Sequence, residues 1–295
     1  MKIIDTGLRR DRLLVIDLNN FIFRSYHAFP MKRNKNGDPI NALNGFFKLY
    51  KKLLLKTGPT HIVVCKDVSK YNYRYDLFPQ YKANRSKSDE ELSSQIKEVW
   101  KLLDALNISS WGFKGFEADD LIGAITTQWV IEFDQIYIAS TDKDLAQLIN
   151  PKVKMYNPVK DQLIGHKELY RQFGLQPHQI VDFLALLGDT ADNVPGVKGI
   201  GEKTAISLLR EFSSVEELYN NLDKIEKPKV FNALKDNKEN AILSKELVVI
   251  PTHMKIPLKA EDTILKPYNI PEIFYEKELY SAIKSIKDIN SWLGQ

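Results

Sequence analysis

The sequence contains a single cysteine among its 295 residues, and this scarcity excludes an internal disulfide. Cys65 lies inside the apolar run HIVVC, which favours a small core side chain over a nucleophile. The five histidines are scattered without an HxxxH pair, so a zinc site has little support. No apolar run approaches the ~20 residues of a membrane span, and the opening MKIIDTGLRRDR lacks the apolar segment of a secretory signal. These absences favour a reducing compartment, the cytoplasm, and argue against a membrane partner.

Acidic residues are present in a pattern, because nine of them stand at the ends of apolar runs. They are Asp17, Asp67, Glu117, Asp119, Asp120, Asp142, Asp144, Asp189 and Asp192. Like charges that lie close together raise each other's pKa and destabilise a fold unless a cation neutralises them. A carboxylate-rich pocket without histidine or thiolate suits hard, oxygen-preferring ions. The pattern therefore predicts a site for Mg²⁺ or Mn²⁺ that processes phosphate groups.

The net charge of +4 is unevenly distributed. Residues 48–102 carry twelve Lys and Arg against six Asp and Glu, so the rest of the chain is slightly acidic. Basic surface around an acidic metal centre is the charge arrangement expected of an enzyme that acts on nucleic acid. A solvated charged face would explain the basic excess alone, but not the two features together.

The first two-thirds of the chain alternates short apolar segments with helical patterns. Candidate strands are 12–17, 61–66, 108–111, 135–140 and 153–156, and the helical patterns between them are 41–56, 89–106 and 118–131. This alternation predicts an α/β fold around a mostly parallel sheet, in which ligands bind beyond the carboxyl ends of the strands. Asp17, Asp67 and Asp142 stand at or just past such ends, so we expect one edge of the sheet to be acidic.

Two further groups of acids coincide with helix starts. Glu117, Asp119 and Asp120 occupy the first turn of the helix expected at 118–131, where the macrodipole favours negative charge. Simple capping would explain one such acid, but three within four residues exceed what capping requires. Asp142 is a plausible N-cap for a helix in KDLAQLI, whereas Asp144 is not explained by capping.

A glycine-rich turn lies in the helical region that begins near residue 177. Its sequence VPGVKGIGEKTAISLL spans 194–209 and combines three glycines with two lysines: Gly196, Gly199, Gly201, Lys198 and Lys203. Glycines permit close backbone approach, and the N–H groups of a helix N-terminus can hold a phosphate. An ordinary helix–helix turn is the alternative, because many such turns contain glycine.

Residues 69–95 interrupt the alternation of strands and helices. This segment interleaves aromatic side chains with cations that include Arg74, Lys82 and Arg85, and it contains no convincing strand. A long insertion of this kind is usually functional. Tyrosines beside cations suit base stacking and phosphate contact on single-stranded nucleic acid. The alternative is a surface loop whose tyrosines pack onto the sheet.

Four motifs together resemble one family. GFEADD, STDKD, FPQYKANR and GDTADNVPGVKGIGEKTA look like the 5′-nuclease family, and the resemblance runs in order from about residue 13 to about residue 265. That family comprises the 5′→3′ exonuclease domains of bacterial DNA polymerase I, stand-alone bacterial and phage 5′→3′ exonucleases, and flap endonucleases. The block IDLNNFIFRSYHAFP is nearer the polymerase I type. We therefore expect a free-standing enzyme or an excised polymerase domain.

The resemblance implies a fold and a division into domains. The fold is α/β, with a PIN-like, mostly parallel sheet flanked by helices, a helical arch, and a C-terminal helical subdomain with a helix–three-turn–helix element. The implied nuclease domain is 1–176, with the arch at about 69–95. The implied DNA-binding subdomain and closing segment are 177–295, in which 266–295 is expected to end the chain as a helix.

The resemblance also implies residue roles. One metal would be served by Asp17, Asp67, Glu117, Asp119 and Asp120, and a second by Asp142, Asp144, Asp189 and Asp192. The groups closest to catalysis would be Asp67, Asp142, Lys82 and Arg85. DNA would be contacted by Arg24, Arg74, Lys82 and Arg85, and by the turn residues Gly196, Lys198, Gly199, Gly201 and Lys203. In some members of the family the turn also binds K⁺.

The implied function is a structure-specific 5′ nuclease of replication and repair. It would use two Mg²⁺ ions, which Mn²⁺ can replace, on DNA with a 5′ flap, a nick or an end, and it would act as a monomer in the bacterial cytoplasm or a phage-infected cell. A non-catalytic module that binds branched DNA is one alternative. A PIN-type ribonuclease is another, but it would lack the arch and the glycine turn.

Overall fold

The computed structural model describes residues 11–85 and 89–294. Its centre is a six-stranded sheet in the order β3-β2-β1-β4-β5-β6, in which only β6 is antiparallel to its neighbour. The strands are β1 Arg12–Asp17, β2 His61–Cys65, β3 Ser110–Trp111, β4 Gln135–Ala139, β5 Val153–Asn157 and β6 Gln162–Ile164. The first five agree with the predicted strands, and the mostly parallel sheet is confirmed.

The sheet is covered on both faces, because successive side chains of β1 point to opposite sides. Leu14 and Ile16 pack into one core with the helices on one face, and Leu13 and Val15 pack into a second core on the other. The first core is formed with α1 Leu18–Ala28, α2 Asn41–Thr57, α4 Glu90–Ala105 and α13 Tyr280–Leu293. The second is formed with α5 Ala118–Gln128, the 3₁₀ helix η1 Asp144–Leu148 and α6 His166–Phe173.

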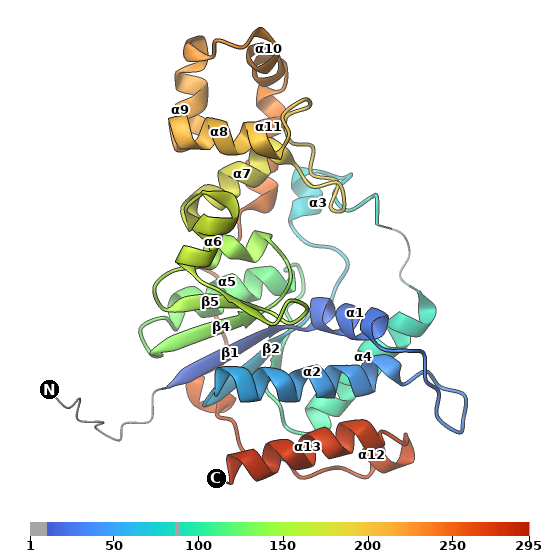
Figure 1. Cartoon of the computed structure of the whole chain (residues 1–295). Coiled ribbons are helices and arrows are strands. Elements are labelled where there is room, and N and C mark those ends of the chain that lie inside the picture. Colours follow the sequence, from blue (N-terminus) through green and yellow to red (C-terminus); the bar gives the residue numbers. More distant parts are fainter. Residues whose placement is uncertain (1–10, 86–88, 295) are drawn as a thin grey trace, which may run out of the picture.

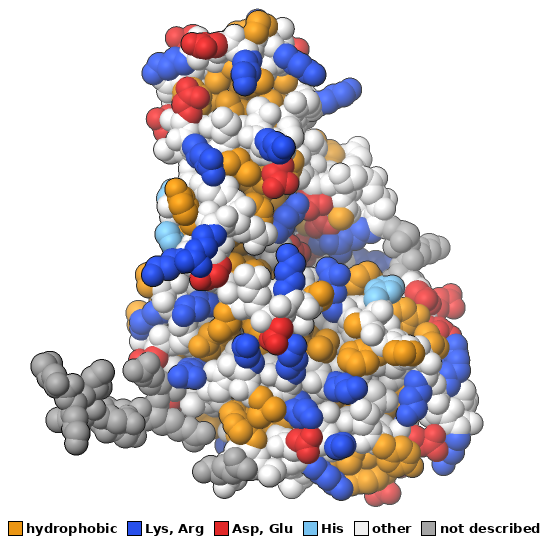
Figure 2. Space-filling view, viewed as in Figure 1, with side chains coloured by type: hydrophobic (Ala, Val, Ile, Leu, Met, Phe, Trp, Pro, Cys, Tyr) orange, Lys and Arg blue, Asp and Glu red, His pale blue; other side chains and the backbone are white. Residues whose placement is uncertain are grey.

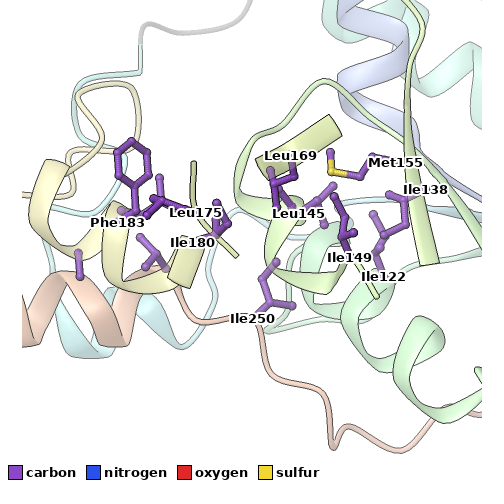
Figure 3. Packing of buried hydrophobic residues seen from close by; sticks show 14 of the residues in the cluster. Ile122, Ile138, Leu145, Ile149, Met155, Leu169, Leu175, Ile180, Phe183 and Ile250 are labelled. Carbon is purple, nitrogen blue, oxygen red and sulfur yellow. The ribbon is translucent and has the colours of Figure 1, made fainter. Parts of the chain in front are cut away.

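A helical region stands on one side of the sheet, at the top of Figure 1. It contains the 3₁₀ turns η2 Pro177–Gln179 and η3 Leu222–Lys224, and α7 Ile180–Leu187, α8 Glu202–Phe212, α9 Val215–Asn220, α10 Pro228–Asp236 and α11 Lys238–Val248. The second core continues into it without a break. Figure 3 shows Ile250 between the sheet-side residues Leu145 and Ile149 and the α7 residues Ile180 and Phe183.

The C-terminal segment returns from the helical region to the sheet. It passes through η4 Ala260–Thr263 and α12 Ile273–Glu276 and ends in α13, which packs along α2 (Figure 1). The Tyr50 and Tyr268 hydroxyls are 2.6 Å apart, and the Ala282 N–H donates to Asn44 Oδ1 at 3.1 Å. The expected closing helix is therefore present. It packs on the sheet half of the molecule, along α2.

Four elements differ from the sequence-based expectations. Helices α1 and α6 were not predicted, and neither was the short strand β6. The helix expected in KDLAQLI is one 3₁₀ segment, η1.

The predicted arch contains the short helix α3 Arg74–Leu77, a run of turns, and the start of α4, while its residues 86–88 lie outside the described residues. Among the described residues, no helix is long and apolar enough to cross a membrane.

Candidate active site

The carboxyl ends of three neighbouring strands bring acids from distant segments together. Asp17 ends β1 and is in register with Cys65, which precedes Asp67 by two residues. Strand β4 pairs with the other side of β1, and Asp142 follows its end. Because the chain proceeds from β1 to β2 on one side and reaches β4 on the other, this edge is the topological switch point of the sheet, where α/β folds bind ligands.

Asp17 serves both the sheet and the first helix. It is the last residue of β1 and the N-cap of α1, where its Oδ1 accepts from the Asn20 N–H at 3.2 Å. Its Oδ2 accepts from the Ser140 hydroxyl at 2.9 Å. Burial, and then repulsion from Asp67, raise the pKa of Asp17 to about 7. The carboxylate is thus held in place in an environment that opposes its negative charge.

Asp67 is held by hydrogen bonds to both of its oxygens. Asn19 Nδ2 donates to Oδ2 at 2.7 Å, and the Ala118 N–H at the start of α5 donates to Oδ1 at 2.7 Å. Burial raises the pKa of Asp67, and repulsion from Glu117 adds to this effect. The carboxylate therefore has a fixed orientation and an unfavourable charge.

The three acids at the start of α5 have different environments. Burial, followed by repulsion from Asp142 and Asp17, raises the pKa of Asp119 well above its usual range. Burial also opposes ionisation of Glu117, but Lys82 and Arg74 outweigh it, and the pKa of Glu117 is lowered. Glu117 and Asp119 therefore belong to the acidic cluster.

Asp120 and Arg74 form a buried ion pair instead of facing the cluster. Their side chains are 0% and 3% exposed, and the guanidinium nitrogens donate to the two carboxylate oxygens at 2.7 and 3.0 Å. Asp120 Oδ2 also accepts the Glu117 N–H at 2.9 Å, which completes a capping box. In this arrangement the Asp120 carboxylate accepts three hydrogen bonds from protein groups, and the Arg74 guanidinium is buried. The pair therefore supports the fold, and the metal role predicted for Asp120 and the DNA role predicted for Arg74 stay predictions.

Breaking this pair is expected to destabilise the fold. Arg74→Met should lower the free energy of unfolding by ~3–5 kcal/mol, because it leaves the Asp120 carboxylate buried and uncompensated. Urea unfolding measures the loss, and adding Asp120→Asn should recover part of it. Arg33→Met, which breaks a surface pair with Glu91, is the matched control. Equal losses in the Arg74 and Arg33 variants would contradict the supporting role.

The acidic cluster has two arms. The first consists of Asp17, Asp67, Glu117 and Asp119, and the second of Asp142 and Asp144, just before and at the start of η1, with Asp189 and Asp192 in the turn after α7. Burial raises the pKa of Asp142, and repulsion from Asp192 and Asp189 acts in the same direction. Burial and then Asp142 raise the pKa of Asp144 well above its usual range. Asp189 Oδ1 accepts the N–H groups of its own turn at 2.7 and 3.3 Å. Repulsion from Asp142 also raises the pKa of Asp17, so the carboxylates of this arm repel those at the end of β1.

Cations of the predicted arch lie against this cluster. Lys82 Nζ contacts Glu117 Oε1 and is 3.7 Å from Asp192 Oδ2, so it bridges the two arms. The Lys82 N–H donates to the Asp192 carbonyl at 2.8 Å, and Arg85 donates to Asp192 Oδ1 at 2.5 and 2.8 Å. Asn193 Nδ2 donates to the Gln80 carbonyl at 2.7 Å. The base of the arch is therefore docked on the turn after α7.

The negative charge of the acidic cluster is only partly neutralised by nearby side chains. Among residues 11–85 and 89–294, no three acidic, histidine or cysteine side chains are arranged to hold one metal ion together. Lys82, Arg85 and Lys143 neutralise part of the charge, the last at 3.3 Å from Asp189. Yet Asp144 Oδ1 is buried without a hydrogen-bond partner. An unpaired buried carboxylate oxygen is costly, and a cluster of oxygen donors that opposes its own ionisation fits a hard divalent cation.

The glycine turn connects α7 to α8. Gly196 has a φ of 62°, and a Cβ there would lie 2.5 Å from the Gly188 nitrogen, so this glycine is required by internal packing. Gly199 has a φ of 94°, and Gly201 is the N-cap of α8 with open space around it. Lys198 and Lys203 are exposed beside them. The turn thus offers a helix N-terminus and two cations to an anion. Gly196 has a packing role, and the DNA contact expected of it stays a prediction.

Arg24 lies at the edge of the site on α1. Its Nε donates to the Thr141 hydroxyl at 3.1 Å, one residue before Asp142, and its side chain is exposed. Figure 2 shows basic side chains spread over this face of the molecule, with acidic side chains in the recess between the helical region and the α1–α2 side. The surface is therefore compatible with a polyanion that crosses the site.

Several residues that hold the acids were not predicted as site residues. They are the hydrogen-bond partners Asn19, Asn20, Asn72, Tyr81 and Ser140, of which Asn72 and Tyr81 donate to Glu117 at 2.9 and 3.1 Å. The available signal was the pair of asparagines one residue after the strand that ends in VID. Polar amides at the end of an apolar strand indicate that its last carboxylate has partners nearby.

Two family models match the chain in succession. The model described as the N-terminal resolvase-like domain of 5′-3′ exonuclease matches residues 12–174, and that described as the C-terminal SAM fold matches residues 175–271. The junction of the two matched ranges falls between α6 and η2. The resolvase-like and SAM-like architectures agree with the sheet and the helical region described above.

Individual relatives and structures agree with these models. DNA polymerase I of Rhizobium leguminosarum is 37% identical over 271 residues, which are 89% of this chain and 27% of that protein. The 5′-3′ exonuclease of Buchnera aphidicola is 35% identical over 268 residues, 88% of this chain and 94% of that protein. A structure of the bacteriophage T5 flap endonuclease with DNA and metal ions has a TM-score of 0.72 at 22% identity, covering 95% and 99% of the two chains, and shows the same fold. This chain belongs to the 5′-3′ exonuclease family.

Proposed function

We propose that the chain is a divalent-metal-dependent nuclease that hydrolyses phosphodiester bonds of DNA as a 5′→3′ exonuclease and flap endonuclease, in replication and repair. The observation that carries this proposal is the convergence of eight carboxylates at the switch point of the sheet, with Lys82 and Arg85 against them. Family membership supports the class of reaction. The phage T5 neighbour, whose structure contains DNA and metal ions, supports the class of substrate and cofactor.

The residues proposed to hold two Mg²⁺ or Mn²⁺ ions form the two arms of the cluster. They are Asp17, Asp67, Glu117 and Asp119 in one arm, and Asp142, Asp144, Asp189 and Asp192 in the other. When bound, such ions activate a water molecule and stabilise the leaving oxygen. Among these proposed ligands, Asp17 is oriented by the chain itself, through the Ser140 hydroxyl and the α1 backbone.

The cations and the glycine turn are proposed to bind different parts of one DNA molecule. Lys82 and Arg85 would contact the reacting phosphate, because they already lie against the carboxylates. Lys198 and Lys203 would hold the phosphates of the adjoining duplex, and K⁺ would bind in the same turn. Recognition by phosphates and DNA shape, with little reading of base sequence, follows from such contacts. We also propose a monomer that acts in the cytoplasm.

One set of substrates tests this function. A 5′-end-labelled flap duplex, a nicked duplex, a blunt duplex and an RNA–DNA hybrid are incubated with the protein in Mg²⁺, Mn²⁺, Ca²⁺ or EDTA. We expect cleavage at the flap junction and release from the 5′ end in Mg²⁺ and Mn²⁺, and none in EDTA. Binding without cleavage would identify the chain as a non-catalytic branched-DNA module. Cleavage of single-stranded RNA in preference to the flap would identify a PIN-type ribonuclease.

The glycine turn is expected to bind duplex without taking part in chemistry. Lys203→Ala should remove about one phosphate contact, so the slope of log affinity against log salt falls by about one unit. Titration of a fluorescent flap duplex in Ca²⁺, at several KCl concentrations, measures the slope, and substituting tetramethylammonium chloride for KCl tests the K⁺ site. Single-turnover cleavage at saturating enzyme should be unchanged. An unchanged slope would leave the turn as an ordinary helix–helix connection.

A further inference from the structure

The first turn of α1 lies between the ends of the two strands that flank β1. Helix α1 starts at Leu18, directly after the last residue of β1, so no loop separates the strand from the helix. Its second and third residues are Asn19 and Asn20. Because β2 and β4 pair with opposite sides of β1, these two side chains are placed to reach one flanking segment each.

The two asparagines use opposite ends of their amide groups. Asn19 donates from Nδ2 to Asp67 Oδ2 at 2.7 Å, on the β2 side. Asn20 accepts at Oδ1 from the Thr141 N–H at 3.1 Å and from the Thr141 hydroxyl at 2.9 Å, on the β4 side. Thr141 immediately precedes Asp142. One dipeptide therefore holds a carboxylate of each arm of the cluster, the second through its neighbour in the chain.

The chemistry of the acceptor fixes the orientation of Asn19. Asp67 in its charged form accepts hydrogen bonds and cannot donate them, so only the NH₂ end of the amide is attracted to it. In this orientation Asn19 Oδ1 is buried without a partner. An unsatisfied buried acceptor costs stability. The Asn19 side chain therefore keeps its hydrogen bond to Asp67 although its own carbonyl oxygen stays unpaired. This is expected if the role of Asn19 is to position Asp67.

The contacts of Asp67 show what this hydrogen bond does. The Ala118 N–H holds Oδ1 at 2.7 Å, and Asn19 is the side-chain donor to Oδ2. With the first bond alone, the carboxylate could rotate about its own axis away from Asp17, whose negative charge repels it. With both bonds, the plane of the carboxylate is fixed while further lone pairs on each oxygen stay free for a cation.

We infer that Asn19 and Asn20 are positioning residues that fix Asp67 and Asp142 on either side of Asp17, and thereby set the affinity of the site for divalent cations. This inference rests on the proposed metal-dependent function. Hydrogen-bond partners of metal ligands orient the ligands, and their loss typically costs ~10–100-fold in metal affinity or activity. Asn19 acts directly on a proposed ligand, so its effect should be the larger of the two.

The test measures metal binding both with and without catalysis. For Asn19→Ala we expect a rise of at least ~10-fold in the Mg²⁺ concentration that gives half of the maximal single-turnover rate. The Mn²⁺ dissociation constant of the DNA-free protein, followed by electron paramagnetic resonance, should rise in parallel. Asn20→Ala should shift both quantities in the same direction by less. Saturating Mg²⁺ should restore much of the rate in each variant.

Asn19→Asp separates positioning from the number of acidic ligands. Aspartate has nearly the same size as asparagine but cannot donate a hydrogen bond when charged, and its charge repels Asp67. If positioning decides affinity, Asn19→Asp weakens Mn²⁺ binding despite the added carboxylate. Tighter Mn²⁺ binding in this variant would overturn the inference. The variant also keeps the comparison valid if Asn19→Ala does not fold.

Asn150→Ala is the matched control. Asn150 Oδ1 accepts the Lys152 and Val153 N–H groups at 2.9 and 3.0 Å at the start of β5, away from the acids. Its loss should lower thermal stability and leave both metal measurements unchanged. If Asn19→Ala behaves like Asn150→Ala, the asparagine is only structural and the inference is wrong. If the wild type shows no metal-dependent cleavage, the proposed function fails, and Mn²⁺ binding alone still decides the positioning role.

Discussion

Asp142→Asn and Asp67→Asn are each expected to reduce single-turnover cleavage of a 5′-flap substrate by more than ~100-fold. The loss of a hydrogen-bond partner of a metal ligand already costs ~10–100-fold, and removal of the ligand's charge should cost more. The two residues lie in different arms of the acidic cluster, at the ends of β4 and β2. Equal losses would indicate that both arms are needed for the same chemical step.

The same substitutions should leave the fold intact. Burial and repulsion raise the pKa of Asp142 and of Asp67, so the folded state resists their ionisation. A group whose pKa is raised by folding binds its proton more tightly in the folded state, and stability is lost as the pH rises through that range. At neutral pH without metal, asparagine removes this unfavourable charge. Thermal unfolding in EDTA should therefore occur at an unchanged or higher temperature in both variants.

Asp288→Asn is the matched control for these variants. Asp288 is exposed on α13, where it pairs with Lys51 at 2.9 Å, and it does not belong to the acidic cluster. Its cleavage rate and its dependence on Mg²⁺ should equal those of the wild type. Wild-type rates in Asp142→Asn or Asp67→Asn, or cleavage that persists in EDTA, would be incompatible with the proposed function.

The sheet and the acids could be predicted from the sequence because both depend on local patterns. Apolar runs bounded by polar residues identify strands, and parallel strands present their carboxyl ends at one edge. Helix α1 was missed because Asp17 is at once the last strand residue and the helix N-cap. A turn signal normally separates two elements, and none separates these. The 3₁₀ type of η1 was not predicted because a segment of five residues permits a 3₁₀ helix as readily as an α-helix.

The separate roles of Glu117, Asp119 and Asp120 could not be read from the sequence. All three precede or open one helix, and their spacing alone does not say which faces the sheet edge. The answer depends on Arg74, which reaches Asp120 from a segment 46 residues earlier in the chain. The same long-range pairing explains why Arg74 appeared to be a DNA contact. From the sequence alone, a cation in a basic segment is expected to face solvent unless its buried partner is known.

The contacts of Lys82 and Arg85 lead to a graded expectation. Lys82 is 16% exposed and touches both arms of the cluster, whereas Arg85 is 54% exposed and pairs with Asp192 alone. Burial opposes the charge of Lys82, but Glu117 and Asp192 outweigh it, and the pKa of Lys82 is raised. The ammonium group therefore stays charged where the reacting phosphate is proposed to lie. Its removal should affect chemistry more than the removal of Arg85.

Lys82→Ala is expected to lower the single-turnover rate at saturating enzyme and Mg²⁺ by at least ~10-fold, since loss of one electrostatic contact to a transition state costs up to ~10²–10³-fold. Arg85→Ala should cost less, and Lys97→Ala, which removes an exposed lysine from α4 of the same basic region, should cost nothing. Flap-duplex affinity in Ca²⁺ is measured in parallel. If Lys82→Ala weakens binding but reacts at the wild-type rate once saturated, Lys82 serves only to dock DNA. The contacts with Glu117 and Asp192 would then be a feature of the DNA-free state alone.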